Sequence, residues 1–326
     1  MRGLLWLVLA AAALWSGYWV VGSRALEQGA ETWFEDQAAL GIIAERESLA
    51  VRGYPNRFDL TVNGIRILDP ATGYGWTAPF AQIFALSYRP NHVIAALPPE
   101  QVILTPSQEV TLLSDKLQAS AVLQPGATVG LNRLTVIGEG IGLQSSLGWQ
   151  AQARTMRFAT KTLSEDGLEH EIGFEALDVV PDPSLSALLP DMPGAVSKLR
   201  LDAVVGIAPG DPLAPDAPPV VSGIDLKEAL VTWGDLGLFG KGRIAANSDG
   251  LTEGRIDFRL TNWRKLVPLL VATGAVSAEA LPTWENALAM LASQSGDPEV
   301  LELPLTMRAG RMSLGPIPLG PAPALR

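Results

Sequence analysis

The feature of the sequence that most constrains the fold is a stretch without any charged side chain, which runs from Gly3 to Ser23 between Arg2 and Arg24. At about 1.5 Å per residue, a helix over this stretch is roughly 30 Å long, which matches the hydrocarbon core of a bilayer. Each of its many Leu and Val side chains favours insertion by about 0.3–0.6 kcal/mol. The stretch therefore predicts a transmembrane helix.

Aromatic side chains lie near both ends of this stretch. Trp15, Tyr18 and Trp19 have helical spacing near its C-terminal end, and Trp6 lies near its N-terminal end. Trp and Tyr gather at the two interfaces of a membrane. The apolar part of a cleaved signal is usually about 7–15 residues long, and this one is longer. Residues 1–24 are therefore interpreted as a transmembrane anchor, with a cleaved signal peptide as the alternative.

Composition and the N-terminal end narrow the location and the function. The short positive start, Met1-Arg2, is typical of the cytoplasmic end of an export signal. The absence of Cys rules out disulfides, thiolate nucleophiles and Cys-ligated metals. A formal net charge of −10 argues against nucleic acid as a partner, because its binders need basic patches. We expect a bacterial inner-membrane protein with the bulk of its chain in the periplasm.

The region after the anchor changes from helical to strand spacing. Residues 25–48 are predicted to be an amphipathic helical stalk, and residues 49–326 a β-rich periplasmic domain in which apolar side chains recur at every second position. Asp166-Gly167 between two alternating runs is a strong hairpin signal. The alternation changes phase between Val62 and Ile65, which predicts either a β-bulge or a tight hairpin at Asn63-Gly64.

Two helices are predicted near the C-terminus. Asn262 is a candidate cap for a helix from Trp263 towards Thr273, and Pro282 opens a second helix that Gly296 ends. The predicted fold class is therefore mainly β: a large curved antiparallel sheet or a β-sandwich-like roll, with a helical pair near the C-terminus, preceded by the N-terminal transmembrane helix.

No set of residues in the sequence has the spacing of a catalytic or metal site. His92 is interpreted as a solvated loop residue, and His170 as a core histidine satisfied by a neighbour. Asn247, Asp249 and Gly250 resemble part of a calcium loop, but both end positions of such a loop would be apolar, so a hairpin turn is favoured. We predict no catalytic residue, no cofactor, no metal and a non-enzymatic protein.

The alternating strands predict a wide apolar sheet face that something must cover. One alternative is a groove that takes lipid acyl chains, and the other is a closed core in a structural or assembly module that binds a protein partner. Both alternatives stay open. The candidate groove residues are Leu60, Val62, Leu117, Leu123, Ile172 and Phe174, with Ala119 and Ala121 beside Leu117.

Four segments together resemble the uncharacterised domain-of-unknown-function family 2125. They are RGYPNRFDL at 52–60, WTAPFAQIFALSYRPNHVIAALPP at 76–99, GLTEGRIDFRLTNWRKL at 250–266 and LELPLTMRAGRMSLGPIPLG at 301–320. The resemblance implies a membrane-anchored envelope protein of alphaproteobacterial type with a long β-rich domain. It carries no assigned activity and gives no residue a role. The strand–Gly–strand style is also distantly similar to AsmA-like envelope proteins associated with lipid handling, as an analogy of fold.

Overall fold

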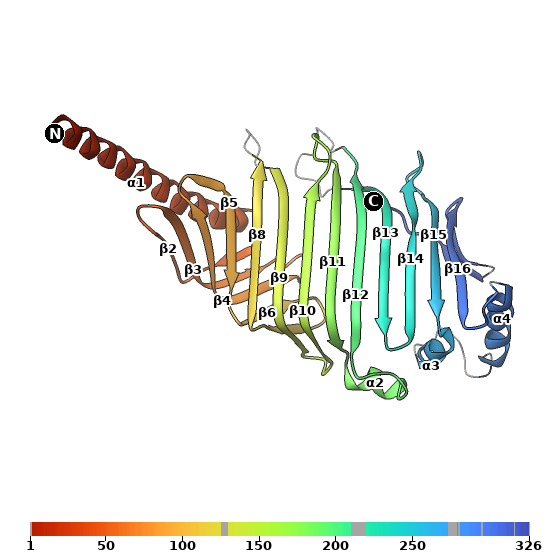
Figure 1. Ribbon diagram of the computed structural model, residues 1–326. Helices are drawn as coiled ribbons and strands as arrows, with labels where there is room; N and C mark the ends of the chain where they lie inside the picture. The colour runs from red at the N-terminus through yellow and green to blue at the C-terminus, as the bar shows by residue number, and fades with distance from the viewer. Residues whose placement is uncertain are drawn as a thin grey trace. The chain divides into compact units, whose positions relative to one another are not determined.

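A computed structural model describes residues 2–124, 130–209, 220–272, 279, 281–294, 296–315 and 317–325. Over these residues the protein is mainly β, and its strands pair antiparallel, which confirms the predicted fold class. The chain divides into two compact units, unit 1 (Met1–Gln150) and unit 2 (Ala151–Arg326). Each unit is described by itself (Figure 1).

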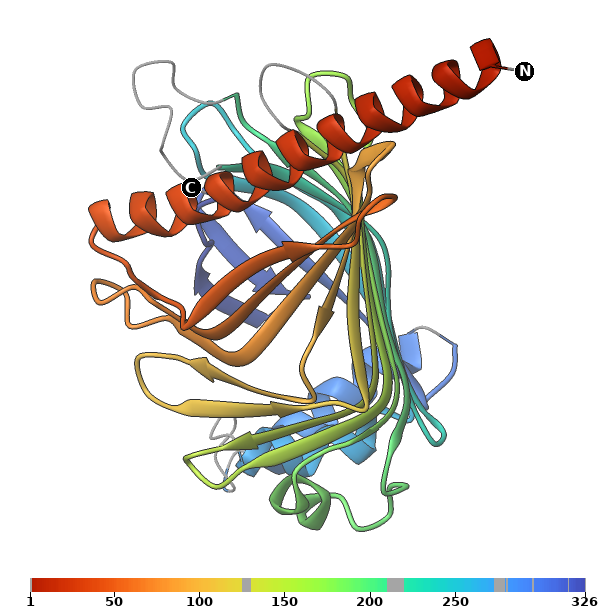
Figure 2. The same cartoon turned by 90° about the vertical axis from the view of Figure 1, so that its left-hand side faces the viewer.

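Unit 1 begins with one continuous helix, α1 (Arg2–Ala39). Its C-terminal half lies on the first three strands, β1 (Ile43–Glu45), β2 (Ser48–Arg52) and β3 (Arg57–Leu68), whereas its N-terminal end extends beyond them (Figure 2). The predicted stalk over residues 25–48 is therefore helical only as far as Ala39, and Ile43–Glu45 is a strand instead. Apolar residues of the helix, such as Phe34, pack against β3, so this part of the helix belongs to the folded unit and is not a free spacer.

The phase change in β3 comes from one backbone conformation. The strand continues through Gly64, which has a φ of +61°, and its register with β4 (Gly75–Leu86) is the same on both sides of this residue. Both alternatives predicted at Asn63-Gly64, the β-bulge and the tight hairpin, are therefore wrong. Val62 and Ile65 are both buried. A left-handed residue, which glycine adopts without strain, lets even positions before it and odd positions after it face one core.

The remaining strands of unit 1 form a ladder that closes on itself. β4 pairs with both β5 and β6, and β9 pairs with both β8 and β7. The β5–β8 and β6–β7 pairings complete the circuit. Each of these six strands therefore pairs with two others of the circuit. The strands are β5 (Arg89–Leu97), β6 (Glu100–Leu104), β7 (Glu109–Leu113), β8 (Lys116–Gln124) and β9 (Gly130–Ser145).

In unit 2 each strand pairs with the next one along the chain, and the strands bend along their length (Figure 2). The predicted hairpin at Asp166-Gly167 joins the first two strands, where the N–H of Leu163 donates to the carbonyl of Glu169 at 2.8 Å. The strands are β10 (Gln150–Thr162), β11 (Glu169–Val180), β12 (Val196–Ile207), β13 (Val221–Trp233), β14 (Leu236–Ala246), β15 (Thr252–Thr261), β16 (Val300–Arg308), β17 (Arg311–Leu314) and β18 (Ile317–Pro321).

The predicted helical pair near the C-terminus is present. It consists of a 3₁₀ turn, η1 (Trp263–Leu266), which leads into α3 (Val267–Ala272), and of α4 (Leu281–Gln294); a further short helix, α2 (Pro183–Leu188), lies between β11 and β12. Thr273, the expected end of the first helix, is outside the described residues. Asn262 does not cap: its side-chain amide donates to the carbonyl of Asp235 at 2.7 Å.

The main core of unit 2 forms where α4 packs on the end of the sheet. Leu288 and Ala292 of α4 are buried against Trp263 of η1 and against Leu301 and Leu303 of β16. A second cluster, around Trp233 and Leu236, lies next to α2 and the segment after it. Both clusters lie close to helices, which leaves the middle of the sheet outside them.

Candidate membrane- and lipid-facing surfaces

The strand register of unit 2 aligns apolar side chains into rows that cross the sheet. One row is Phe158, Phe174, Leu201, Ala229, Gly240, Phe258 and Leu303, each opposite the next across β10 to β16. The row beside it is Thr160, Ile172, Ala203, Leu226, Gly242, Ile256 and Leu305. We call these two rows the central apolar face. It carries a single hydroxyl group, that of Thr160, and no charge.

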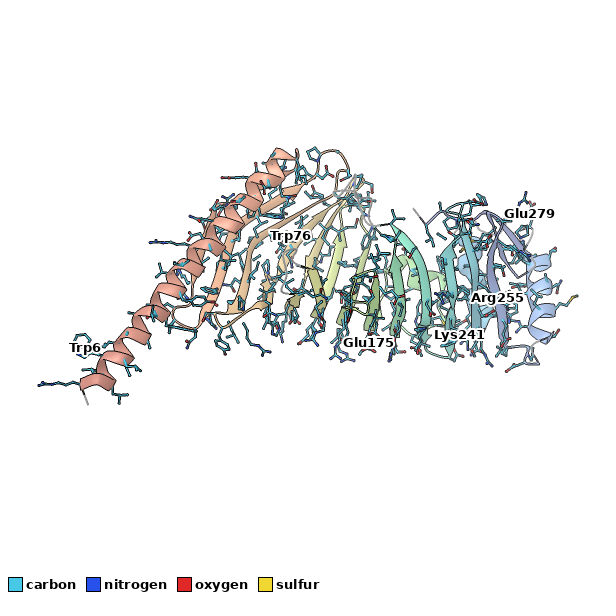
Figure 3. The ribbon with its side chains drawn as sticks, turned by 90° about the horizontal axis from the view of Figure 1, so that it is seen from above. Trp6, Trp76, Glu175, Lys241, Arg255 and Glu279 are labelled. Atoms are coloured by element: carbon cyan, nitrogen blue, oxygen red, sulfur yellow. The ribbon has the colours of Figure 1, made fainter. Side chains whose placement is uncertain are left out.

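The opposite side of the same strands is charged. Lys198 lies 3.2 Å from Glu175, and Arg200 lies 3.3 Å from Glu228 across the β12–β13 pair. Glu175, Lys241 and Arg255 all point to this side of the strands (Figure 3). Ion pairs this exposed stabilise the sheet little, but they make this face compatible with water. The sheet is therefore amphipathic: one side carries the two uncharged rows, and the other side carries the ion pairs together with a few apolar side chains such as Leu230 and Phe239.

Within unit 2, the cluster under α4 covers one end of the central apolar face, and Ala203 and Leu226 of the second row are also buried, whereas the first row is more exposed on β11 and β12. Leu303 belongs to the cluster under α4, whereas Ile172, Phe174 and Leu201 belong to neither cluster. Ile172 and Phe174 are half-buried, and Leu201 is 38% exposed in the middle of a strand. Side chains of this size in a closed core are normally buried, so this part of the face has the exposure of an open sheet.

The six predicted groove residues fall into three environments. Ile172 and Phe174 lie in adjacent rows of the central apolar face. Leu60 and Val62 are buried together in unit 1, in a cluster with Phe34 of α1. Leu117 is buried opposite Leu97 in the closed ladder, and Leu123 is half-buried opposite Leu131 at the end of β8. Only the pair in unit 2 lies on an apolar surface that its own unit leaves open.

The N-terminal helix presents a second apolar surface. Residues 3–14 are exposed along their whole length, and this helix is long and apolar enough to span a membrane. From Trp15 onward the helix contacts the strands of unit 1. The ring N–H groups of Trp15 and Trp19 donate to the carbonyls of Pro55 and Arg57 at 3.0 and 2.7 Å.

The family model described as an uncharacterised protein conserved in bacteria (DUF2125) matches residues 19–323. The chain belongs to this family. The match includes the docked half of α1 and extends through both units, as the four resembling segments predicted. No curated protein and no solved structure matches the chain. The further likeness to AsmA-like envelope proteins stays a prediction.

Both histidines of this DUF2125 member have hydrogen-bond partners. His92 lies in β5, where its Nε2 is 2.9 Å from the hydroxyl oxygen of Ser120, so its interpretation as a solvated loop residue is wrong. The Nε2 of His170 is 3.0 Å from the carbonyl oxygen of Gly167, so it has the expected neighbour, but the residue is half-buried rather than part of the core. Asn247 begins a hairpin turn in which its carbonyl accepts from the N–H of Gly250. Among the described residues, no group of three or more His, Asp or Glu side chains has the geometry of a metal site.

Sequence reasoning missed the extent of the apolar face. Leu201 and Phe258 had a visible signal, because each belongs to an alternating run with the correct period. The alternation around Phe158 was less clear, because its neighbour Ala159 is also apolar and the pattern does not show which of the two faces the core. What the runs did not contain was the register, and only the register shows that Phe158, Phe174 and Leu201 fall in one line.

One ion pair gives the protein a testable pH dependence. Lys265 Nζ donates to both carboxylate oxygens of Asp235, at 2.5 and 2.7 Å, and this bond holds the pKa of Asp235 below its ordinary value of 3.8. A depressed folded-state pKa contributes stability above the ordinary value, and this contribution is lost as pH falls through the lowered pKa. We expect Asp235→Asn to lower the urea midpoint at neutral pH and to converge with the native protein on acidification through this range.

The partner variant controls for this effect. Lys265→Gln removes the same hydrogen bond and should give the same convergence at low pH. A difference between Asp235→Asn and the native protein that stays constant from neutral to acidic pH would show that the carboxylate charge is not its source.

Proposed function

We propose that this DUF2125 member is a non-enzymatic protein anchored in the bacterial inner membrane, with the bulk of its chain in the periplasm, whose central apolar face shelters the acyl chains of envelope lipids. The observation that supports the proposal most is the alignment of two uncharged rows across seven strands, with Leu201 still 38% exposed. The N-terminal helix supplies the membrane attachment.

The dimensions of this face suit an acyl chain. Neighbouring strands are about 4.8 Å apart, so a row that crosses seven strands is roughly 30 Å long. A lipid tail laid along such a row gains about 0.8 kcal/mol for each methylene group removed from water. Gly240 has no side chain, and the ring of Phe258 packs over it, since a Cβ there would lie 2.7 Å from that ring. The charged side of the strands is stable in contact with water, whereas the apolar side is stabilised when a ligand shields it from water.

Neighbouring residues of β12 permit a matched crosslinking test. Leu201 points to the apolar side and is 38% exposed, while the Arg200 side chain points to the charged side and is 43% exposed. A photo-crosslinking amino acid is placed at one position or the other in the full-length protein and activated in intact cells. We expect lipid adducts, detected by mass spectrometry of the purified protein, at position 201 and none at position 200.

The other results would contradict the proposal in distinguishable ways. Protein adducts without lipid at position 201 would favour the alternative of an assembly module with a protein partner. Equal labelling at both positions would show that contact with lipid does not depend on the face. An absence of adducts at both positions would mean that the apolar face is closed in the cell.

A further inference from the structure

The end of unit 1 where α1 leaves the strands is rich in aromatic groups. The loop between β2 and β3 and the turn between β4 and β5 lie together here, since the N–H of Ser87 donates to the carbonyl of Asn56 at 2.9 Å. Tyr54 and Tyr88 project from these two segments and are 58% and 61% exposed. We call this end the collar, defined by Trp15, Tyr18, Trp19, Tyr54, Leu86 and Tyr88.

Three residues of α1 fix the helix to the collar through polar bonds. Besides the two tryptophan bonds to Pro55 and Arg57, the hydroxyl of Tyr18 donates to the carbonyl of Ser87 at 2.6 Å. The Trp19 ring meets the Tyr54 ring edge-on, with centroids 5.4 Å apart. The aromatic residues of α1 that are typical of a membrane interface are therefore bonded to both loop segments. The loop residues of the collar consequently lie beside the Trp15–Trp19 part of the helix.

The length of the helix that is free of contacts determines where the collar lies relative to the bilayer. Only residues 3–14 are clear of the strands, and twelve helical residues span roughly 18 Å of a hydrocarbon core about 30 Å thick. Extending the span to Trp19 adds about 7 Å and brings the collar to the membrane surface. A span this short is accommodated when the bilayer thins or when flanking groups enter the interface. The exposed Tyr54, Leu86 and Tyr88 side chains are such groups.

The charge of the collar also suits a membrane surface. Segments 52–57 and 86–91 contain Arg52, Arg57 and Arg89 and no acidic residue, in a chain whose net charge is −10. Arg57 pairs with Asp59, whereas Arg52 and Arg89 have no ion-pair partner among the described residues. Basic side chains beside a membrane helix are attracted to anionic headgroups.

We propose that the collar is a second membrane contact, in which Tyr54, Leu86 and Tyr88 lie in the headgroup layer of the bilayer that α1 spans. The inference rests on the anchoring part of the proposed function and is independent of lipid on the central apolar face. Its consequence is that unit 1 has a defined orientation on the membrane, with the collar end of the β3–β4 pair at the surface and the opposite end away from it.

Two tyrosines at opposite ends of the same strand pair allow a matched test. Tyr88 follows β4 at the collar, and Tyr74 precedes β4 at the far end; they are 61% and 60% exposed. Strands of this length separate the two ends by roughly 40 Å. The chain has no native Cys, so Tyr88→Cys and Tyr74→Cys each give a single site for an environment-sensitive nitrobenzoxadiazole probe.

The full-length labelled proteins are reconstituted in vesicles of phosphatidylethanolamine and phosphatidylglycerol, with or without a lipid spin-labelled near its headgroup. Flotation with the vesicles is measured first, as the test of anchoring. We expect both proteins to float and the spin label to quench the probe at position 88 at least about twofold more than the probe at position 74.

Other outcomes overturn the inference and separate it from the anchoring. Protein that floats but shows no quenching at position 88 keeps its anchor and loses the collar contact. Equal quenching at both positions would mean that unit 1 lies flat on the bilayer. Protein that does not float would overturn the anchoring, and the collar contact with it. Circular dichroism confirms that both variants keep the β structure.

Discussion

Gly254→Ala should destabilise unit 2 by roughly 3 kcal/mol or more, because the new methyl group has no space and the backbone no suitable conformation. Gly254 has a φ of +139°, and a Cβ here would lie 2.2 Å from the carbonyl oxygen of Arg243 and 2.8 Å from the Cα of Ile244. Both contacts are with the backbone of β14, so relief requires the β14–β15 pair to separate. Urea unfolding of the full-length protein, followed by tryptophan fluorescence, measures the loss.

Gly173→Ala is the matched control in the same sheet. A Cβ at Gly173 would meet no heavy atom within 4 Å. Replacing a strand glycine at such a site lowers the entropy of the unfolded chain, so we expect no loss of stability and a gain of up to about 1 kcal/mol. If both substitutions destabilised the protein equally, the close approach of β14 and β15 at Gly254 would be wrong.

The close approach at Gly254 has a consequence for the apolar face. Gly242 repeats the contact from the other strand, since its Cβ would lie 2.2 Å from the carbonyl oxygen of Arg255. These two glycines permit one close register between β14 and β15. A slip by a single residue would turn the apolar rows to the charged side and the ion pairs to the apolar side. The position of the glycines therefore helps to keep Ile256 and Phe258 on the face that carries Phe174 and Leu201.

The sequence was most informative where one local property decides the structure. The alternation around Leu117 and around Phe174 depends only on strand period, and the structure has strands at both places. Pairing between distant strands was not visible, because a strand such as β9 carries no local mark of which partner it takes. Its N-terminal part pairs with β8 and its C-terminal part with β7, on either side of Gly140, which has a φ of +60°.

The contacts of the aromatic residues of α1 with distant segments were likewise not visible in the sequence. Trp15 and Trp19 were predicted as interfacial residues from their helical spacing and position. Their hydrogen bonds to Pro55 and Arg57 cross about 40 residues of sequence. An aromatic side chain with one polar atom is suited both to the membrane interface and to docking on a backbone carbonyl, and spacing alone does not separate the two roles.

The largest effect on location is expected from charges in the free part of α1. Leu9 and Ala13 are exposed and touch no strand. An Arg near the centre of a membrane-spanning helix costs about 2.5–3.5 kcal/mol, so Leu9→Arg combined with Ala13→Arg should disfavour insertion by roughly 5–7 kcal/mol. Because residues from Trp15 onward keep their contacts with unit 1, the strands should still fold. We expect the double variant to move from the membrane pellet to the soluble fraction and to remain resistant to protease.

Leu40→Arg is the matched control for this change. Leu40 directly follows α1, is 75% exposed and lies at the opposite end of the helix from the free part. This variant adds one guanidinium group, against two in the double variant, and places it outside the apolar span, so it should stay in the membrane pellet. If Leu9→Arg/Ala13→Arg also stayed there, the attachment would not depend on residues 3–14 crossing the bilayer. The exposed aromatic and basic groups of the collar would then be the remaining attachment of unit 1 to the membrane. In that case, adding Tyr88→Glu to the double variant should release the protein into the soluble fraction.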